Sequence, residues 1–289
     1  MDVKRAGQKS KPVPPAAREY WDAVAEEWTA NQRFALWRRH SDAINSALLR
    51  RWLPAQRVAR LLKTDLFDEA VTQGLYPLLA EYADELVGVD VSPGIVELVK
   101  ARFPALNSRA ADVRELPFAD VSFDVIVSLS TLDHFDSKQD IEMALNELAR
   151  VLRPGGHLLL TLDNLSHPAV WLRSILPQRL LLGLGLVPYR VGTTCSPRQL
   201  ELYCRHSGLE LECTTAVLHC PRALAVASAR LLEHASVRTQ QHYLKFLTLF
   251  ERLEDCPIRF LTGHFTAIHA RKPGKGGIPE SSAEAWSRE

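Results

Sequence analysis

The chain of 289 residues lacks several features that would point directly to a class of protein. Its 35 Lys and Arg side chains nearly balance 34 Asp and Glu side chains, so net charge gives no reason to expect a nucleic-acid partner. No basic stripe with interleaved aromatic residues occurs either, and we expect no nucleic acid among its partners. No apolar run reaches the ~18 residues of a membrane span.

Cysteine is scarce, and no Cys-x-x-Cys pair occurs. The five cysteines are Cys195, Cys204, Cys213, Cys220 and Cys256. An odd count without close pairs argues against a disulfide framework and against a zinc site, so we expect reduced thiols and no metal. The first 15 residues are basic but lack an apolar segment, so we expect no secretory signal and a cytoplasmic location.

Strands and helices alternate through the middle of the chain. Five segments are typical of buried or short strands, at 57–63, 85–91, 107–111, 123–130 and 157–162. Helices are expected between them near 72–83, from the start signal Ser92-Pro93, and at 138–152, where Pro154-Gly155-Gly156 breaks the last one. This order predicts an α/β fold, a doubly wound Rossmann-like sheet with right-handed crossovers.

Different patterns flank this alternation. From Arg18 to about Trp52 the sequence reads as helical, with an apolar face of Tyr20, Trp21, Val24, Ala25 and Trp28. An apolar insertion at 168–192 is followed by a helix at 196–207, a strand at 209–219, helices at 222–252 and a strand at 264–271. We expect a disordered arm at 1–17, a domain at 18–272 and a disordered tail at 273–289. The domain divides into a core at 56–165, a helical cap at 166–208, and C-terminal strands and helix at 209–272.

Two carboxylates follow predicted strands. Asp90 ends the strand in LVGVDVSPG, and Asp112 comes just after the strand near 107–111. Ligands of open α/β sheets lie outside the carboxyl ends of the strands, where one carboxylate can accept from a ribose diol and another from an adenine amine. Alternatively, Asp90 only caps the next helix.

Three motifs resemble those of class I S-adenosylmethionine-dependent methyltransferases: VGVDVS, ADVRELPFADVSFDVIVSLSTLDHF and LARVLRPGGHLLLTL. The resemblance covers about residues 18–165 and is nearest to the group that modifies small molecules; REYWDAVAEEW is similar to that group's N-terminal helix. It implies a seven-stranded sheet whose last strand is antiparallel, and S-adenosyl-L-methionine as cofactor. It also implies a role for particular residues: Asp90 beside Val91 at the ribose, Asp112 beside Val113 at the adenine, Ser128 and Ser130 near the methionine portion, and Asp133 and His134 facing the methyl group or the acceptor.

Glycine is absent where that family's first loop reads acid-x-Gly-x-Gly-x-Gly. The loop here is LLKTDLFDEAVTQG, in which Asp65 could stand for the acid and the first glycine is Gly74. Three interpretations remain open. Asp65 or Glu69 accepts from the cofactor's ammonium group with Thr64 adding a hydroxyl, or the loop moves outward and affinity falls, or the fold has lost its cofactor. The last would make the chain a non-catalytic methyltransferase-like binding protein.

The acceptor is expected to be small and largely apolar, of lipid-like or natural-product type. The N-terminal helices and the insertion would form its pocket, and Arg173, Arg179 and Arg190 could meet an acidic group or reach solvent. The segment 168–192 could touch a membrane surface or be an ordinary lid helix. His134 is the candidate general base, with packing at a strand end as the alternative; His167, Tyr189, His219 and His264 are weaker candidates. The sequence does not indicate an oligomeric state.

Overall fold

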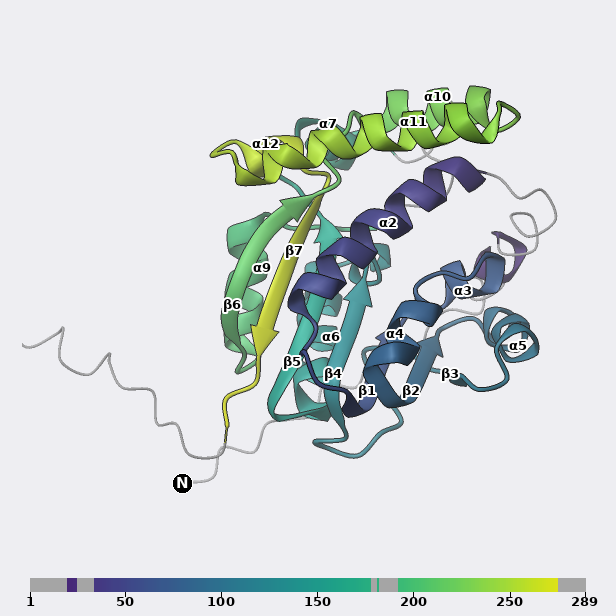
Figure 1. Ribbon diagram of the computed structural model, residues 1–289. Coiled ribbons are helices and arrows are strands. Elements are labelled where there is room, and N and C mark those ends of the chain that lie inside the picture. The colour runs from purple at the N-terminus through teal and green to yellow at the C-terminus, as the bar shows by residue number, and fades with distance from the viewer. Residues whose placement is uncertain (1–19, 25–33, 178–180, 182–191, 275–289) are drawn as a thin grey trace, which may run out of the picture.

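The computed structural model describes residues 20–24, 34–177, 181 and 192–274, and within them it shows one seven-stranded sheet (Figure 1). The strands are β1 (Val58–Thr64), β2 (Ala83–Asp90), β3 (Asn107–Ala110), β4 (Phe123–Leu129), β5 (Leu152–Asp163), β6 (Glu210–Val217) and β7 (Phe265–Arg271). Their order is β3-β2-β1-β4-β5-β7-β6. Strands β1 to β5 pair in parallel, whereas β7 runs antiparallel between β5 and β6. The predicted fold class is confirmed.

Helices cover both faces of this sheet. Those before β5 are α2 (Ala35–Trp52), α3 (Phe67–Val71), α4 (Tyr76–Tyr82), α5 (Pro93–Arg102), the 3-10 helix η1 (Leu132–His134) and α6 (Lys138–Val151). Those after it are α7 (Pro168–Ile175), α9 (Pro197–His206), α10 (Arg222–Leu232), α11 (Val237–Thr248), the 3-10 helix η2 (Leu249–Asp255) and α12 (Arg259–Thr262). Residues Tyr20–Val24 are also helical.

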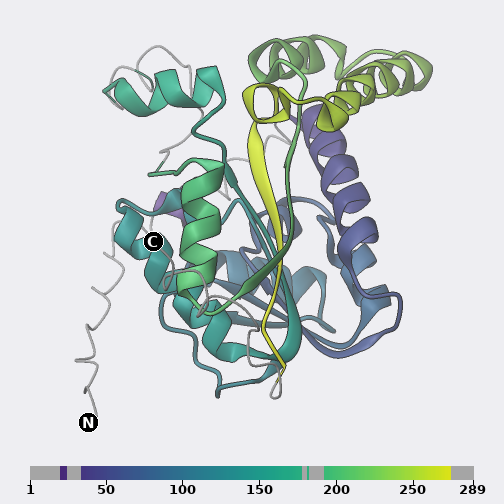
Figure 2. The same cartoon turned by 90° about the vertical axis from the view of Figure 1, so that its left-hand side faces the viewer.

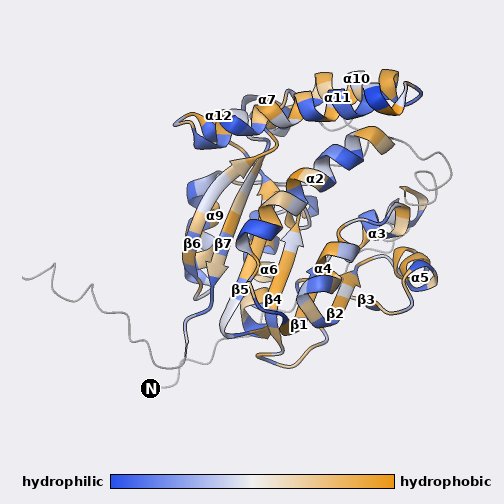
Figure 3. Cartoon of the chain, viewed as in Figure 1, coloured by the Kyte–Doolittle hydropathy of each residue, from blue (hydrophilic) through white to orange (hydrophobic). Residues whose placement is uncertain are grey.

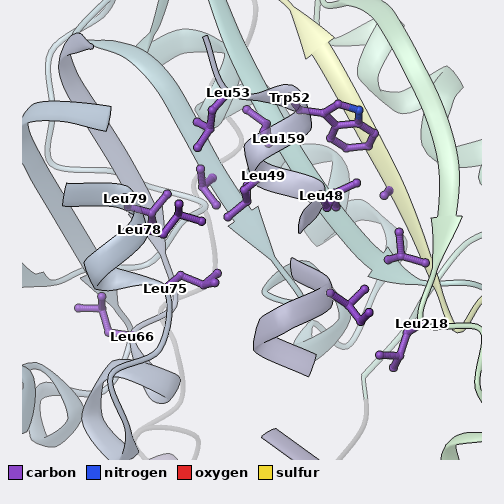
Figure 4. Close-up of a cluster of buried hydrophobic side chains, with 14 of the residues drawn as sticks. Leu48, Leu49, Trp52, Leu53, Leu66, Leu75, Leu78, Leu79, Leu159 and Leu218 are labelled. Atoms are coloured by element: carbon purple, nitrogen blue, oxygen red, sulfur yellow. The ribbon is translucent and has the colours of Figure 1, made fainter. Parts of the chain in front are cut away.

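The core divides between the two faces because successive strand residues point to opposite sides. Leu61 of β1 packs with α2, α4 and α5, whereas Leu62 packs with α6 and α9. Figure 4 shows the first cluster, in which Leu49 and Trp52 of α2 lie near Leu159 of β5. Such continuous burial explains why the central strands read as unbroken apolar runs, which are orange in Figure 3.

One local prediction was incomplete and another was wrong. The helix expected near 72–83 is α4, but a second short helix, α3, precedes it, and between the two the buried carboxylate of Glu69 accepts from the backbone N–H of Leu75 at 2.9 Å. Pro154-Gly155-Gly156 does not precede a strand but lies within β5, which begins at Leu152. Gly155 has φ +81° and donates to the Lys272 carbonyl, and the pairing register of β4 and β5 shifts beside it.

The expected helical stretch at 222–252 forms α10, α11 and η2, and with α7 and α12 these lie above the carboxyl ends of the parallel strands (Figures 1 and 2). No helix within the described ranges is long and apolar enough to span a membrane. The predictions for Ala25, Trp28, Arg179, Tyr189, Arg190 and most of the two chain ends lie outside the described residues.

Candidate active site

A cavity of ≈ 1280 Å³ lies at the carboxyl ends of the parallel strands. Its floor comes from the ends of β1, β2 and β4, and helices α2, α7, α10 and α12 supply walls and roof. Among the predicted site residues, it is lined by Thr64, Asp65, Asp90, Val91, Asp112, Val113, Ser130 and His134. Most residues singled out from widely separated motifs therefore meet at one place, the place where open α/β sheets bind ligands.

Asp90 is held rigidly at the end of β2. One carboxylate oxygen accepts from the backbone N–H of Leu66 at 2.8 Å, and the other accepts from that of Ser92 at 2.9 Å. Burial, together with the negative charge of Asp65, raises the pKa of Asp90 to about 7. Helix α5 has its own cap, Ser92, whose hydroxyl accepts from Ile95 N–H at 3.0 Å. Each oxygen of Asp90 keeps a lone pair for a hydroxyl donor in the cavity.

The glycine-poor loop turns sharply at Asp65. This residue has φ 69°, a left-handed conformation that favours glycine, and its carboxylate accepts from Phe67 N–H at 2.8 Å. Leu66 is fully buried against β2, where a Cβ on Gly88 would lie 2.6 Å from its Cδ2. Asp65 therefore takes the place of the motif's first glycine rather than of its acid, and Lys63 falls at the acid's place.

Lys63 and Glu69 form a buried ion pair beneath this loop. Nζ of Lys63 lies 2.8 Å from Oε2 of Glu69, with side-chain exposures of 8% and 0%, and it also donates to the Asp65 carbonyl. Burial opposes the charge on Lys63, but the carboxylates of Glu69 and Asp65 outweigh it and raise its pKa. Glu69 is not part of the cavity wall. The prediction that Glu69 accepts from the cofactor is corrected, because its carboxylate is occupied by Lys63 and Leu75.

Asp112 occupies the wall beside Asp90, in contact with an arginine that sequence reasoning missed. The guanidinium of Arg114 donates to both oxygens of Asp112, at 2.7 Å in the shortest contact, and to Asp140 at 2.6 Å. Val113 lines the cavity next to it. An aspartate two residues before an arginine on a tight turn was a visible signal for this pairing. The pair fixes the carboxylate in place and also competes for its lone pairs.

The hydroxyls at the ends of β1 and β4 are linked to one another. Thr64 bonds to Ser128 at 2.8 Å and to Thr131 at 2.9 Å. Ser128 is fully buried and does not line the cavity, so its predicted cofactor contact is corrected: it supports Thr64. Ser130 does line the cavity, with φ 51° and its N–H bonded to Thr161.

His134 projects into the cavity under the N-terminal helix. The Trp21 ring stacks edge-on against it at 4.7 Å and against Phe67 at 6.2 Å. Asp22 accepts from Gly94 N–H at 3.2 Å and from the Ser92 hydroxyl, which ties this helix to α5. The helix thus covers the cavity between the β1 loop and η1.

Asp133 faces away from the cavity. It is 4% exposed, and its Oδ1 lies 4.0 Å from His134 Nε2, without a hydrogen-bond partner among the described residues. Burial and the nearby charge of Asp163 raise its pKa to about 6. The prediction that Asp133 faces the methyl group or acceptor is therefore corrected: it lies behind His134. Its backbone carbonyl accepts from Gly192 N–H at 3.0 Å, which anchors the chain returning from α7.

A second polar cluster lies under the roof; sequence reasoning named its Arg173 and His264 but missed its Asp163 and Arg222. Asp163 ends β5 and contacts Arg173 of α7, and its Oδ1 lies 3.3 Å from His264 Nε2. Arg222 of α10 lies 2.6 Å from the same ring nitrogen. Burial would raise the pKa of Asp163, but His264 and Arg173 hold it well below the usual range; burial and Arg222 lower that of His264 to about 4. The position of Asp163 at a strand end was the signal available.

This arrangement fits the nucleoside part of S-adenosylmethionine. Asp90 and Asp112 supply ionisable acceptors, and Ile95 and Val113 supply apolar wall beside them. In the same cavity, Asp65 offers a carboxylate and Thr131 a hydroxyl. Within the described ranges, no group of His, Cys, Asp and Glu side chains could hold a metal ion.

Known proteins agree with this reading. Residues 70–160 match the family described as a methyltransferase domain. A probable S-adenosylmethionine-dependent methyltransferase of Mycolicibacterium smegmatis is 36% identical over 88 residues, which cover 30% of this chain and 33% of the relative. A demethylmenaquinone methyltransferase of Paenarthrobacter aurescens is 32% identical over 166 residues, which cover 53% of this chain and 60% of the relative. The chain therefore spans less than two thirds of the length of either relative.

The fold is shared with solved structures. A methyltransferase solved in complex with the Haloferax volcanii Trm112 methyltransferase activator superposes with a TM-score of 0.57 and 18% identity, over 88% of this chain and 97% of that one. The matched segment and the shared fold lead to one conclusion. Residues 70–160 match a methyltransferase domain, and the chain is similar to S-adenosylmethionine-dependent methyltransferases in this part of its sequence.

Proposed function

We propose that this protein transfers a methyl group from S-adenosylmethionine to a small, largely apolar acceptor. The observation that carries the proposal is one continuous cavity of ≈ 1280 Å³, which extends from Asp90 and Asp112 to apolar side chains of the roof. A typical site for one small ligand measures roughly 300–1,000 Å³, so this cavity has room for a donor and an acceptor together.

The donor end is built from rigid acceptors. Asp90 receives the ribose hydroxyls, and Asp112, held by Arg114, receives the adenine amine. The bound donor supplies a methyl group on a positively charged sulfur; the acceptor's lone pair forms the new bond, the carbon–sulfur bond breaks toward sulfur, and any proton leaves to a base. The protein's main contribution is to hold the two reactants in line and to exclude water.

His134 is proposed to take that proton. It lines the cavity near the end of β4, and Trp21 fixes one side of its ring. His264 is a weaker base, because an Arg222 N–H occupies its Nε2 and its pKa is lowered to about 4. An oxygen acceptor would use a base within hydrogen-bond reach, and the position of His134 in the cavity wall supports this role.

The acceptor end is apolar with one polar corner. Its walls include Trp37, Leu172, Val226, Leu261 and Phe265. These side chains favour an acceptor with a hydrocarbon body, and the relative named a demethylmenaquinone methyltransferase is consistent with such a molecule. The Asp163–Arg173–His264–Arg222 cluster would meet its polar end.

Calorimetric titration with S-adenosylmethionine and S-adenosylhomocysteine tests the donor site. We expect micromolar binding that is lost in Asp90→Ala and kept in Asp84→Ala, an exposed carboxylate at the start of the same strand. Absence of binding to folded protein would favour the other hypothesis, a methyltransferase-like protein without cofactor. Transfer of a radioactive methyl group from S-adenosylmethionine into solvent-extractable compounds of a cell extract then tests the acceptor class.

A further inference from the structure

The helical layer above the cavity exposes an unusual number of large apolar side chains. Of the thirteen exposed in the described chain, nine lie on α7, α10, α11, η2 and α12, and a tenth, Ile258, is the N-cap residue of α12. They are Trp171, Leu172, Ile175, Leu224, Leu231, Val237, Phe246, Leu249, Ile258 and Leu261. Figures 1 and 2 show these helices in one layer at the top of the molecule. We call this set the roof patch, because exposed large apolar side chains gathered on one layer of helices are typical of a contact site.

The orientation of α7 is fixed by its inner side. Val170 is buried, and Arg173 turns inward to its ion pair with Asp163. Trp171, Leu172 and Ile175 consequently share the outer face, with exposures of 53%, 50% and 57%. Tryptophan and aliphatic residues on one face of an otherwise anchored helix are typical of helices that lie in a membrane interface.

The cavity opens within the roof patch. Leu172, Leu224 and Leu261 each line the cavity, and each is at least half exposed. They come from three different helices, α7, α10 and α12. These three leucines therefore belong both to the exposed patch and to the wall of the cavity's acceptor end.

The charges on the same helices indicate which kind of surface the roof patch binds. Between residues 222 and 262 the exposed charged side chains are Arg230, Arg238, Lys245 and Arg252 against Asp255 alone. The other acids of this stretch, Glu233, Glu251 and Glu254, are half-buried; Glu251 accepts from the backbone N–H groups of Leu218 and His219, and Glu254 pairs with Arg51. In a chain of net charge +1, this local excess of cations is complementary to an anionic surface.

We propose that the roof patch docks on an anionic lipid bilayer and that the acceptor enters the cavity from the bilayer. The entry of the acceptor from the bilayer rests on the proposed function, whereas the docking does not. A second copy of the chain is a poorer occupant, because a two-fold contact would bring the same four cations together.

Co-sedimentation of the full chain with vesicles tests the docking. We expect binding to vesicles of equal parts phosphatidylcholine and phosphatidylglycerol, and weak binding to phosphatidylcholine alone. Trp171→Ser with Ile175→Ser is expected to lower the partition coefficient by more than about tenfold, since each buried methylene contributes to partitioning. The matched control is Leu202→Ser, an exposed leucine on α9 below this layer.

Charge-reversal variants test the electrostatic contribution to vesicle binding. Arg238→Glu with Lys245→Glu is expected to remove the preference for phosphatidylglycerol, whereas Arg198→Glu with Arg205→Glu on α9 leaves it unchanged. Equal binding of all variants, or no binding by the unaltered chain, would overturn the proposal. So would a dimer in sedimentation velocity that Trp171→Ser with Ile175→Ser dissociates. Because vesicle binding needs neither donor nor methyl transfer, it fails or succeeds independently of the titration that tests the proposed function.

Discussion

Glu69→Gln is expected to destabilise the protein strongly, although it alters a single atom. Glu69 is fully buried, and its partner Lys63 is only 8% exposed, so the ammonium would be left in the interior without its neighbouring carboxylate at 2.8 Å. The amide oxygen of glutamine can still accept from Leu75 N–H, so the helix break between α3 and α4 need not change. The loss is therefore that of a compensating charge.

The magnitude follows from the burial of both groups. Removing one partner of a buried ion pair costs about 3–5 kcal/mol, because the other charge stays desolvated. For a domain of this size, that free energy corresponds to a fall of roughly 10 °C in melting temperature. Adding Lys63→Met removes the stranded charge, so the double variant is expected to be more stable than Glu69→Gln alone.

Urea unfolding followed by circular dichroism, for the two single variants and the double variant, gives the coupling between the residues. Lys63→Met alone should be destabilising as well, because it leaves the Glu69 carboxylate buried without its cation. A Glu69→Gln variant within about 1 kcal/mol of the unaltered chain would refute the reasoning. So would single effects that simply add in the double variant, since residues in contact should not be independent.

Three further predictions concern the cavity. Because the pKa of Asp90 is raised to about 7 and its ionised form is the better acceptor, binding of methylthioadenosine should tighten about tenfold as pH rises through that value; titrations of Asp90→Asn should show no such change. Trp21→Ala should weaken S-adenosylhomocysteine binding by about 1 kcal/mol without lowering the melting temperature, whereas Trp171→Ala should leave the affinity unchanged. Arg173→Met should destabilise the fold by about 3 kcal/mol at neutral pH. The low pKa of Asp163 stabilises the fold only where this carboxyl is ionised. The difference in free energy of unfolding between the unaltered chain and Arg173→Met should therefore shrink below about pH 4, where the carboxyl of the variant takes up a proton. Unfolding curves measured across pH check this.

Local signals in the sequence predicted most of the fold. The apolar runs placed β1 and β2 within two residues of their ends, because strands buried on both faces leave no alternation to misread. Ser92 and Ser196 marked the starts of α5 and α9, and both hydroxyls accept the expected backbone N–H. A capping side chain and the backbone N–H that it accepts from lie within four residues of each other, so the sequence alone can indicate where a helix begins.

The side chains of the site were harder to predict. A position at the end of a strand predicts that a residue lies near the cavity, but it does not predict whether the side chain points into the cavity. Ser128 and Asp133 lie near the cavity and face away from it. Asp65 was assigned to the acid of the loop motif, whereas it takes the place of the first glycine. Its positive φ angle indicates this, and the sequence does not show that angle. Asp163 was missed because two of its neighbours in the cluster, Arg222 and His264, come from elements far along the chain, and only Arg173 follows on the next helix.

The donor wall and the roof of the cavity come from different halves of the chain. Asp90, Asp112 and His134 all precede β5, whereas α7, α10 and α12, which form the roof, all follow it. Substitutions in the roof can therefore change which acceptor is admitted while the donor wall stays as it is. In evolutionary terms, related chains can change their acceptor while inheriting the first half unchanged, and an engineer can randomise α10 and α12 and still screen with the same donor.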